Sequence, residues 1–287
     1  MNNRVLRLAA LLVFLRATVA FAADLTPRRV ENLNRDWKFA KGAQAGAEAM
    51  DFNDADWLPV RLPHDWAISG PCEPQGDPHT GKLPWRGEGW YRKSFALPAA
   101  DAGQRVYLDF DGVMAMPTVY VNGQKAGGWD YGYMSFRVDA TDFVKAGQRN
   151  VVAVHVDTRQ HNSRWYPGAG IYRKVQLVVN EPVHVAQWGT FVTTPQVADD
   201  SATIRVETTL ENHTLSAVEP EVETTLLDPK GKEVARQRVR LCIIRQRALT
   251  WPRYCPSLTE ASLAEKAFVS PVDTLNCHFT PAASAGR

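Results

Sequence analysis

The sequence has little net charge and, beyond its first residues, no long hydrophobic run. Its 287 residues include 33 Lys and Arg against 31 Asp and Glu, a formal net charge of +2. So small a charge offers no field for nucleic acid or an anionic membrane surface. A membrane helix needs about 20 apolar residues, and no such stretch occurs. We therefore expect neither a nucleic-acid partner nor a membrane segment.

Cysteine and the common catalytic motifs are also scarce. The chain has four cysteines: Cys72 stands alone, and Cys242, Cys255 and Cys277 fall near the end. This is too few for a disulfide scaffold, and the spacing predicts no particular pair. C-x-x-C, zinc-finger histidine spacing, G-x-S-x-G, H-E-x-x-H and phosphate-binding glycine loops are missing as well. We expect no metal, no cofactor and no catalytic residue, and we interpret His64 and His155 as packing or surface histidines.

The start of the chain is typical of an export signal. Arg4 and Arg7 precede the apolar run Leu8–Leu15, and Ala20-Phe-Ala22 supplies a small-residue cleavage pattern. An ordinary N-terminal helix is the alternative. We predict a signal peptide over residues 1–23 and a periplasmic or secreted protein.

Residues 24–181 have the pattern of an all-β domain. A helical apolar stripe is missing, whereas period-2 alternation and β-branched runs recur, typical of strands with one buried face. Asn122-Gly123 favours a tight hairpin after Thr118–Val121, because a type I′ turn needs positive φ at both positions. The predicted strands lie at 106–110, 118–121, 135–138, 151–156 and 175–179. We predict a jelly-roll β-sandwich.

A second β segment is predicted over residues 182–240. Thr203–Leu210 and Glu221–Leu227 alternate, Asp228-Pro-Lys-Gly231 has turn chemistry, and 233–239 supplies a returning strand. An immunoglobulin-like sandwich needs about seven strands, so we predict part of one.

The character of the chain changes near residue 240. Residues 236–253 hold six arginines and no acidic residue, and alternation is lost afterwards. One interpretation is a basic tail for an anionic partner. We prefer another, in which residues 241–287 are an atypical tail translated out of frame after a frameshift.

Three segments combine aromatic and polar side chains in loops: Leu62–Trp66, Gly87–Lys93 and Ser163–Arg173. Aromatic rings pack on the C–H faces of sugars, while Asp, Asn and Arg bind the hydroxyls. Any single aromatic residue here is more often an edge-packing residue than a ligand-binding one. Asp65 and Glu88 are two acids that hydrolysis could use, but their spacing does not support a catalytic pair.

Together these motifs resemble the N-terminal part of glycoside hydrolase family 2. The resemblance rests on Asn32–Phe39 (NLNRDWKF), Trp57–Trp66 (WLPVRLPHDW), Gly89–Phe95 (GWYRKSF), Asp109–Val113 (DFDGV) and Val119–Gly123 (VYVNG). Arg164–Arg173 (RWYPGAGIYR) is similar to the bacterial β-galactosidase branch. The motifs occur in family order over residues 30–180, and residues 183–240 resemble the start of the family's immunoglobulin-like domain.

The resemblance implies a sugar-binding domain that helps to shape a substrate site facing a (β/α)₈ barrel. The two catalytic glutamates of this retaining family lie on that barrel, so it assigns no catalytic residue here. By loop position it implies sugar contacts from Asp65, Arg164 and Trp165, with a β-galactoside-like carbohydrate as ligand. Three functions stay open: the N-terminal part of an exported hydrolase that is inactive alone, a free-standing carbohydrate-binding module, or a non-functional truncation product. Oligomeric state is not predicted.

Overall fold

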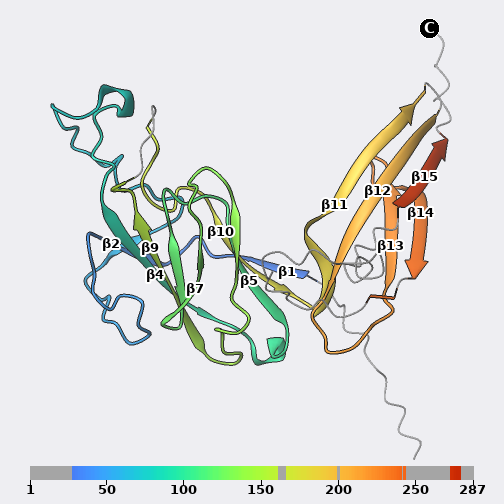
Figure 1. Ribbon diagram of the computed structural model, residues 1–287, viewed down its shortest axis with the longest axis horizontal. Coiled ribbons are helices and arrows are strands. Elements are labelled where there is room, and N and C mark those ends of the chain that lie inside the picture. Colours follow the sequence, from blue (N-terminus) through green and yellow to red (C-terminus); the bar gives the residue numbers. More distant parts are fainter. Residues whose placement is uncertain (1–27, 161–165, 199–200, 241, 244–271, 279–287) are drawn as a thin grey trace, which may run out of the picture.

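The computed structural model describes residues 28–160, 166–198, 201–240 and 242–243, and the backbone of 272–278. The described segments are almost entirely β, which confirms the predicted all-β class (Figure 1). The two helices in this part are short 3₁₀ turns, η1 Pro78–Thr80 and η2 Ala99–Asp101. Within the described residues, no helix is long and apolar enough to cross a bilayer.

The first part of the chain folds into a sandwich of two antiparallel sheets. One sheet has the order β1-β10-β5-β8 and the other β3-β2-β4-β9-β6-β7. The strands of the first sheet are β1 Arg28–Asn32, β5 Arg105–Phe110, β8 Phe136–Asp139 and β10 Val175–Asn180. Those of the second are β2 Trp37–Lys41, β3 Leu58–Val60, β4 Glu88–Ala96, β6 Thr118–Val121, β7 Gln124–Gly128 and β9 Arg149–Asp157. All five strands predicted for residues 24–181 are present: the one at 118–121 has the predicted ends, and the other four are shifted or extended by one or two residues.

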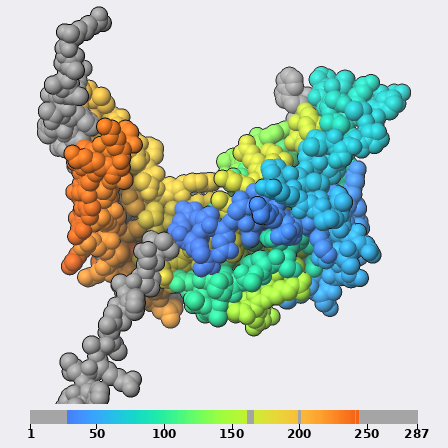
Figure 2. Space-filling model, turned by 180° about the vertical axis from the view of Figure 1, so that it is seen from behind, coloured from blue at the N-terminus to red at the C-terminus, as the bar shows by residue number. Residues whose placement is uncertain are grey.

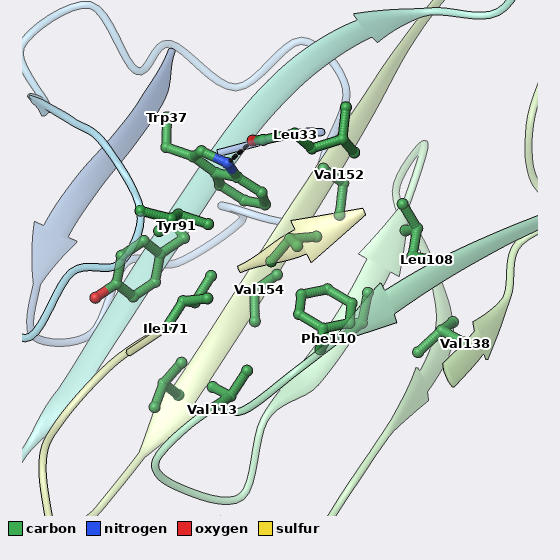
Figure 3. Packing of buried hydrophobic residues seen from close by; sticks show 14 of the residues in the cluster. Leu33, Trp37, Tyr91, Leu108, Phe110, Val113, Val138, Val152, Val154 and Ile171 are labelled. Atoms are coloured by element: carbon green, nitrogen blue, oxygen red, sulfur yellow. Dashed lines mark hydrogen bonds between the residues drawn. The ribbon is translucent and has the colours of Figure 1, made fainter. Parts of the chain in front are cut away.

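Alternating side chains of both sheets fill one large core. Trp37, Tyr91, Phe110, Leu108 and Ile171 are almost completely buried there. Figure 3 shows these residues converging between the sheets, with the Trp37 indole N–H donating to the Leu33 carbonyl. Burial of large side chains contributes about 1.5–3 kcal/mol each, so this cluster is the main source of stability.

The Asn122-Gly123 turn has the predicted conformation. Its φ angles are 51° and 87°, the left-handed values of a type I′ turn. It joins β6 to β7, and the Asn122 side chain donates to Phe143 O and Asn150 Oδ1. The turn is thus fixed by tertiary contacts as well as by its local chemistry.

The second part is a smaller β region. Here β11 Val183–Val197 pairs with β12 Ser201–Asn212, and β13 Glu221–Leu227 pairs with β14 Glu233–Arg240. The backbone of β15 Val272–His278 pairs with β12. Its core is small: Val206 is buried against Ile204, Leu226 and Ala235.

Two sequence interpretations change in this region. Half of the arginine run belongs to the fold, because Arg236, Arg238 and Arg240 lie on β14 and form ion pairs with Glu221, Glu223 and Glu233. The tail also supplies a strand, β15, in a segment where the sequence shows no alternation. This strand pairs with the edge of β12 through backbone hydrogen bonds, which do not depend on an alternating pattern of side chains. Residues 1–27, 244–271 and 279–287 lie outside the described part, so the signal peptide and the frameshift stay predictions.

Candidate functional site

One end of the sandwich gathers most of its long loops. Strand register places Glu88, at the start of β4, opposite Asp157, at the end of β9. Thr118, at the start of β6, lies opposite His155, so the loops before β4 and β6 and after β9 leave at the same end. An arm of residues 67–87 projects from this end, away from the second β region (Figures 1 and 2). We call this end the loop end.

Asp65 is the polar centre of the loop end. Its Oδ1 accepts hydrogen bonds from the backbone N–H groups of Ala67, at 2.9 Å, and Ala169, at 3.2 Å. Its Oδ2 accepts from the Tyr166 hydroxyl at 2.6 Å. A carboxylate has about four lone-pair sites, so these three donors leave room for one more. Burial and the Asp65 carboxylate raise the pKa of Tyr166, which keeps its hydroxyl protonated as a donor.

The loop of residues 166–173, which we call the glycine loop, packs closely against the segment around Asp65 because it contains glycine. At Gly170 φ is +124°, and an added Cβ would lie 2.2 Å from the Tyr91 hydroxyl oxygen. The backbone N–H of His64 donates to Ile171 O, and that of Trp66 donates to Ala169 O. His64 Nδ1 lies 2.8 Å from the Tyr91 hydroxyl, and burial lowers the pKa of the imidazole. His64 is thus the packing histidine that the sequence predicted.

The loop of residues 129–134 between β7 and β8, which we call the aromatic loop, adjoins the glycine loop. The Tyr172 hydroxyl donates to Gly132 O at 2.8 Å, and Met114 forms a β-bridge with Gly170. The side chains beside Gly132 face solvent: Trp129 is 43% exposed, Tyr131 54% and Tyr133 42%. Tyr131 and Tyr133 lie 5.6 Å apart in a tilted pair. Exposed aromatic rings of this kind provide flat faces on which the C–H groups of a sugar can pack.

Glu88 takes part in a separate cluster. Its carboxylate lies 2.9 Å from His155 Nε2 and forms an ion pair with Arg159 at 2.5 Å, and Arg159 also pairs with Asp157. The hydrogen bond from Arg159 is the main cause of a lowered pKa at Asp157. Buried Thr158 fixes this region, because its hydroxyl donates to Trp85 O and accepts from Gly87 N–H. Asp65 and Glu88 therefore have different hydrogen-bonding partners.

The structure places one of the three predicted sugar-binding residues. Asp65 lies at the loop end as expected, while Arg164 and Trp165 lie outside the described residues. Sequence reasoning missed Tyr166, which belongs to the same quoted motif, and the aromatic loop. The signal for that loop was Trp129-Asp-Tyr-Gly-Tyr-Met134, a run of aromatic residues between two strands.

Comparison with known proteins gives these loops a context. Residues 77–182 match the family described as glycosyl hydrolases family 2, sugar binding domain. That range includes Glu88, the aromatic loop and Tyr166, and it ends where the second β region begins.

Curated relatives extend the match over most of the chain. A β-galactosidase of Bacteroides ovatus is 43% identical over 217 residues, 75% of this chain and 25% of that protein. A β-glucuronidase of Formosa agariphila is 30% identical over 239 residues, again 75% of this chain and 24% of the other protein. The chain thus spans about a quarter of the length of these relatives.

Solved structures of glycosyl hydrolase family 2 members have a similar fold over the same part of the chain. A glycosyl hydrolase family 2 member from Bacteroides cellulosilyticus superposes with a TM-score of 0.70 at 34% identity, covering 76% of this chain and 30% of that one. A β-glucuronidase of the same family gives 0.71 at 29% identity, covering 77% and 26%.

Proposed function

Because the chain belongs to glycosyl hydrolase family 2 through its N-terminal sugar-binding domain, we propose that it binds the sugar end of a β-galactoside. In this proposal it is the N-terminal part of an exported β-galactosidase-like hydrolase. The observation that carries the proposal is the Asp65 carboxylate, held by Tyr166 and two backbone amides with one lone-pair site left over. A fixed carboxylate is a specific acceptor for a sugar hydroxyl.

The aromatic loop supports the same function. Trp129, Tyr131 and Tyr133 are exposed, although rings of this size cost free energy when left in water. A sugar ring that packs on them would cover part of that surface. Tyr172 connects this loop to the glycine loop that Asp65 holds, so both sets of groups are fixed relative to each other.

The choice of a galactoside is supported by similarity in sequence. The relative at 43% identity is named a β-galactosidase, whereas the β-glucuronidase of Formosa agariphila is 30% identical. A glucuronide carries a carboxylate of its own. Repulsion between that carboxylate and Asp65 would weaken its binding near this residue.

We further propose that the 287-residue chain does not hydrolyse glycosides by itself. Retaining hydrolysis needs two carboxyl groups about 5–5.5 Å apart, and Asp65 and Glu88 are each engaged with other groups. Turnover of a chromogenic galactoside by this chain would contradict this part of the proposal. Export is supported by the N-terminal sequence pattern, and mass spectrometry of the mature protein checks it, with cleavage expected near Ala23.

Binding is tested with the 287-residue chain. Methyl β-galactoside is titrated against tryptophan fluorescence and backbone NMR shifts, with methyl β-glucuronide as the competing ligand class. Asp65→Asn and Tyr131→Ala are expected to weaken binding at least tenfold, because the first removes a charged acceptor and the second a ring face. Asp228→Asn is the matched control: Asp228 also accepts from two backbone amides, but in the β13–β14 turn.

The outcomes separate the functions left open by the sequence. Galactoside binding that Asp65→Asn abolishes and Asp228→Asn leaves unchanged supports the proposal. Equal loss in both variants would assign the effect to folding, and tighter binding of the glucuronide would overturn the substrate class. Strong retention on polysaccharides together with no preference for single sugars would favour a free-standing carbohydrate-binding module.

A further inference from the structure

Three side chains of metal-ligating type meet where the second β region joins the sandwich. His184 lies at the start of β11, and Glu211 and His213 lie at the end of β12 and just after it. One ligand atom from each lies within 4.8 Å of the other two. The His184 side chain is 4% exposed, Glu211 28% and His213 24%, so the cluster is largely shielded from solvent.

Strand register brings the three residues together. His184 lies directly opposite Glu211 in the β11–β12 ladder. The imidazole rings of His184 and His213 stack with their centroids 5.5 Å apart and their planes 14° from parallel. Both Nε2 atoms face the same carboxylate oxygen, Glu211 Oε2, at 3.3 Å from His184 and 2.9 Å from His213.

The hydrogen bond at the other ring nitrogen fixes the tautomer of His184. Its Nδ1 lies 2.7 Å from the carbonyl oxygen of Glu181, which can accept but not donate. Nδ1 therefore carries the hydrogen, and in the neutral ring Nε2 presents a lone pair. That lone pair faces the Glu211 carboxylate, another acceptor, and two acceptors in contact need a cation or a proton between them.

Among the described residues, the charged partners of Glu211 are His184 and His213, and no lysine or arginine forms an ion pair with it. The Tyr107 hydroxyl is the neighbouring donor on the sandwich side, but it lies 3.5 Å from His184 Nε2, at the limit of a hydrogen bond. Arg105 is directed to Asp139 and, at 3.5 Å, to the Tyr107 hydroxyl.

We propose that His184, Glu211 and His213 bind one divalent transition-metal ion of the zinc type, with His Nε2, carboxylate oxygen and His Nε2 as ligand atoms. Tetrahedral zinc with bonds of about 2.0–2.1 Å holds its ligand atoms roughly 3.3 Å apart, and the separation between His184 and Glu211 has this value. Imidazole nitrogen favours zinc, copper or nickel, whereas calcium and magnesium take oxygen ligands. The Glu181 carbonyl orients His184 through its other nitrogen, the usual support of a metal-bound imidazole.

Sequence analysis expected no metal because it relied on the short spacings of zinc fingers. Here one ligand comes from β11 and two from the end of β12, and the hairpin register joins them. No motif of adjacent residues reveals such a site. The proposal is independent of sugar binding, because the cluster lies at the opposite end of the sandwich from Asp65.

The position of the ion gives it a structural effect. His184 packs edge-on against Tyr107 of β5, with ring centroids 5.9 Å apart. It also forms a hydrogen bond with the carbonyl oxygen of Glu181, in the segment that links the two regions. His213 also lines a cavity of about 470 Å³ whose other walls include Gln104, Val106 and Pro182. An ion held by these three residues would link the start of β11 to the end of β12, beside the contact between His184 and Tyr107.

The test uses the 287-residue chain after treatment with a chelator. Isothermal titration with ZnCl₂ at pH 7.5 is expected to give one equivalent bound, with a melting temperature that rises with zinc concentration. MgCl₂ and CaCl₂ are expected to give neither effect. A Co²⁺ spectrum is expected to show a tetrahedral site without a thiolate charge-transfer band, which excludes Cys72 and Cys242 as ligands.

Variants assign the ligands. His213→Gln and Glu211→Gln are expected to weaken zinc binding at least tenfold. The matched control is His79→Gln, because His79 pairs with Asp77 at 3.0 Å but has no third ligand in the described structure, and zinc affinity is expected to stay unchanged. Circular dichroism confirms folding, and if Glu211→Gln does not fold, His213→Gln decides. Absence of binding below about 100 µM zinc, binding unchanged in His213→Gln, or a cobalt–thiolate band would overturn the proposal.

Discussion

The two β regions have similar sequence patterns but differ in how much they bury. In the sandwich, alternating residues such as Trp37 and Phe110 are almost completely buried between two sheets. In the second region, β11 leaves Trp188 74% exposed and Phe191 61% exposed. Alternation thus determines which strands form, whereas burial depends on whether a second sheet covers their apolar face. The following predictions test this contrast, from the largest effect to the smallest.

Removal of a large ring should destabilise the sandwich far more than the second region. Trp37→Ala deletes a fully buried indole and its hydrogen bond to Leu33 O, and should cost about 3–5 kcal/mol of unfolding free energy. Phe191→Ala, at an exposed site, should cost less than about 0.5 kcal/mol. Urea denaturation measures both. A comparable loss in the two variants would mean that Phe191 is covered in solution.

Two glycines with positive φ separate crowding from backbone strain. Gly170→Ala places a methyl group 2.2 Å from the Tyr91 hydroxyl oxygen and should cost about 2–3 kcal/mol, whereas nothing lies within 4 Å of an added Cβ at Gly231. Gly231→Ala should cost about 1 kcal/mol, from its φ alone. Thermal unfolding and sugar titration are the measurements. If Gly170→Ala retained full sugar affinity, the glycine loop would have no part in binding.

The buried ion pair of the sandwich should be sensitive to acid. Arg92 is 1% exposed and pairs with Asp54, which Lys38 also contacts. Partial burial raises the pKa of Asp54, but the hydrogen bonds from Lys38 and Arg92 outweigh it and lower the pKa below 3.8. The stability from ionised Asp54 is therefore present above about pH 3.8 and is lost as pH falls through the lowered value.

Asp54→Asn should lower the unfolding free energy by about 1–2 kcal/mol at pH 7. The difference from the unchanged chain should begin to shrink below about pH 3.8, where Asp54 of the unfolded chain becomes protonated, and should vanish once the pH lies below the lowered pKa of the folded chain. Urea titrations at a series of pH values measure this. A difference that is constant down to pH 2 would contradict the ion-pair explanation.

The exposed charge pairs of the second region should contribute least. Glu223 pairs with Arg236 at 3.0 Å and Arg238 at 2.6 Å, in contact with solvent. Surface pairs of this kind are weak and screened by salt. Glu223→Gln should produce a small fall in melting temperature at low ionic strength and none at about 1 M NaCl. A fall that persists in salt would show that the pairs are shielded.

Features that depend on neighbouring residues could be predicted from the sequence, whereas features that depend on contacts between distant residues could not. The β6–β7 hairpin was predictable because Asn122-Gly123 fixes its own turn. Strand β11 was missed because a register shift between Val185 and Thr190 interrupts its alternation. At the site, Asp65 was predicted by resemblance, but its bond to Tyr166, 101 residues away, depends on tertiary packing. The His184–Glu211 pair could not be inferred either, because it requires the strand register.

The charged ladder on β14 has a consequence for how copies of this chain meet. Both β11 and β14 are edge strands among the described residues, and unpaired edges are templates for intermolecular pairing. Arg236, Arg238 and Arg240 would repel the same strand of another molecule, since like charges would face each other. Strand β11 instead exposes Phe191 and Val192. Aggregation in concentrated solution should therefore begin at β11, and the substitution Val192→Lys should delay it.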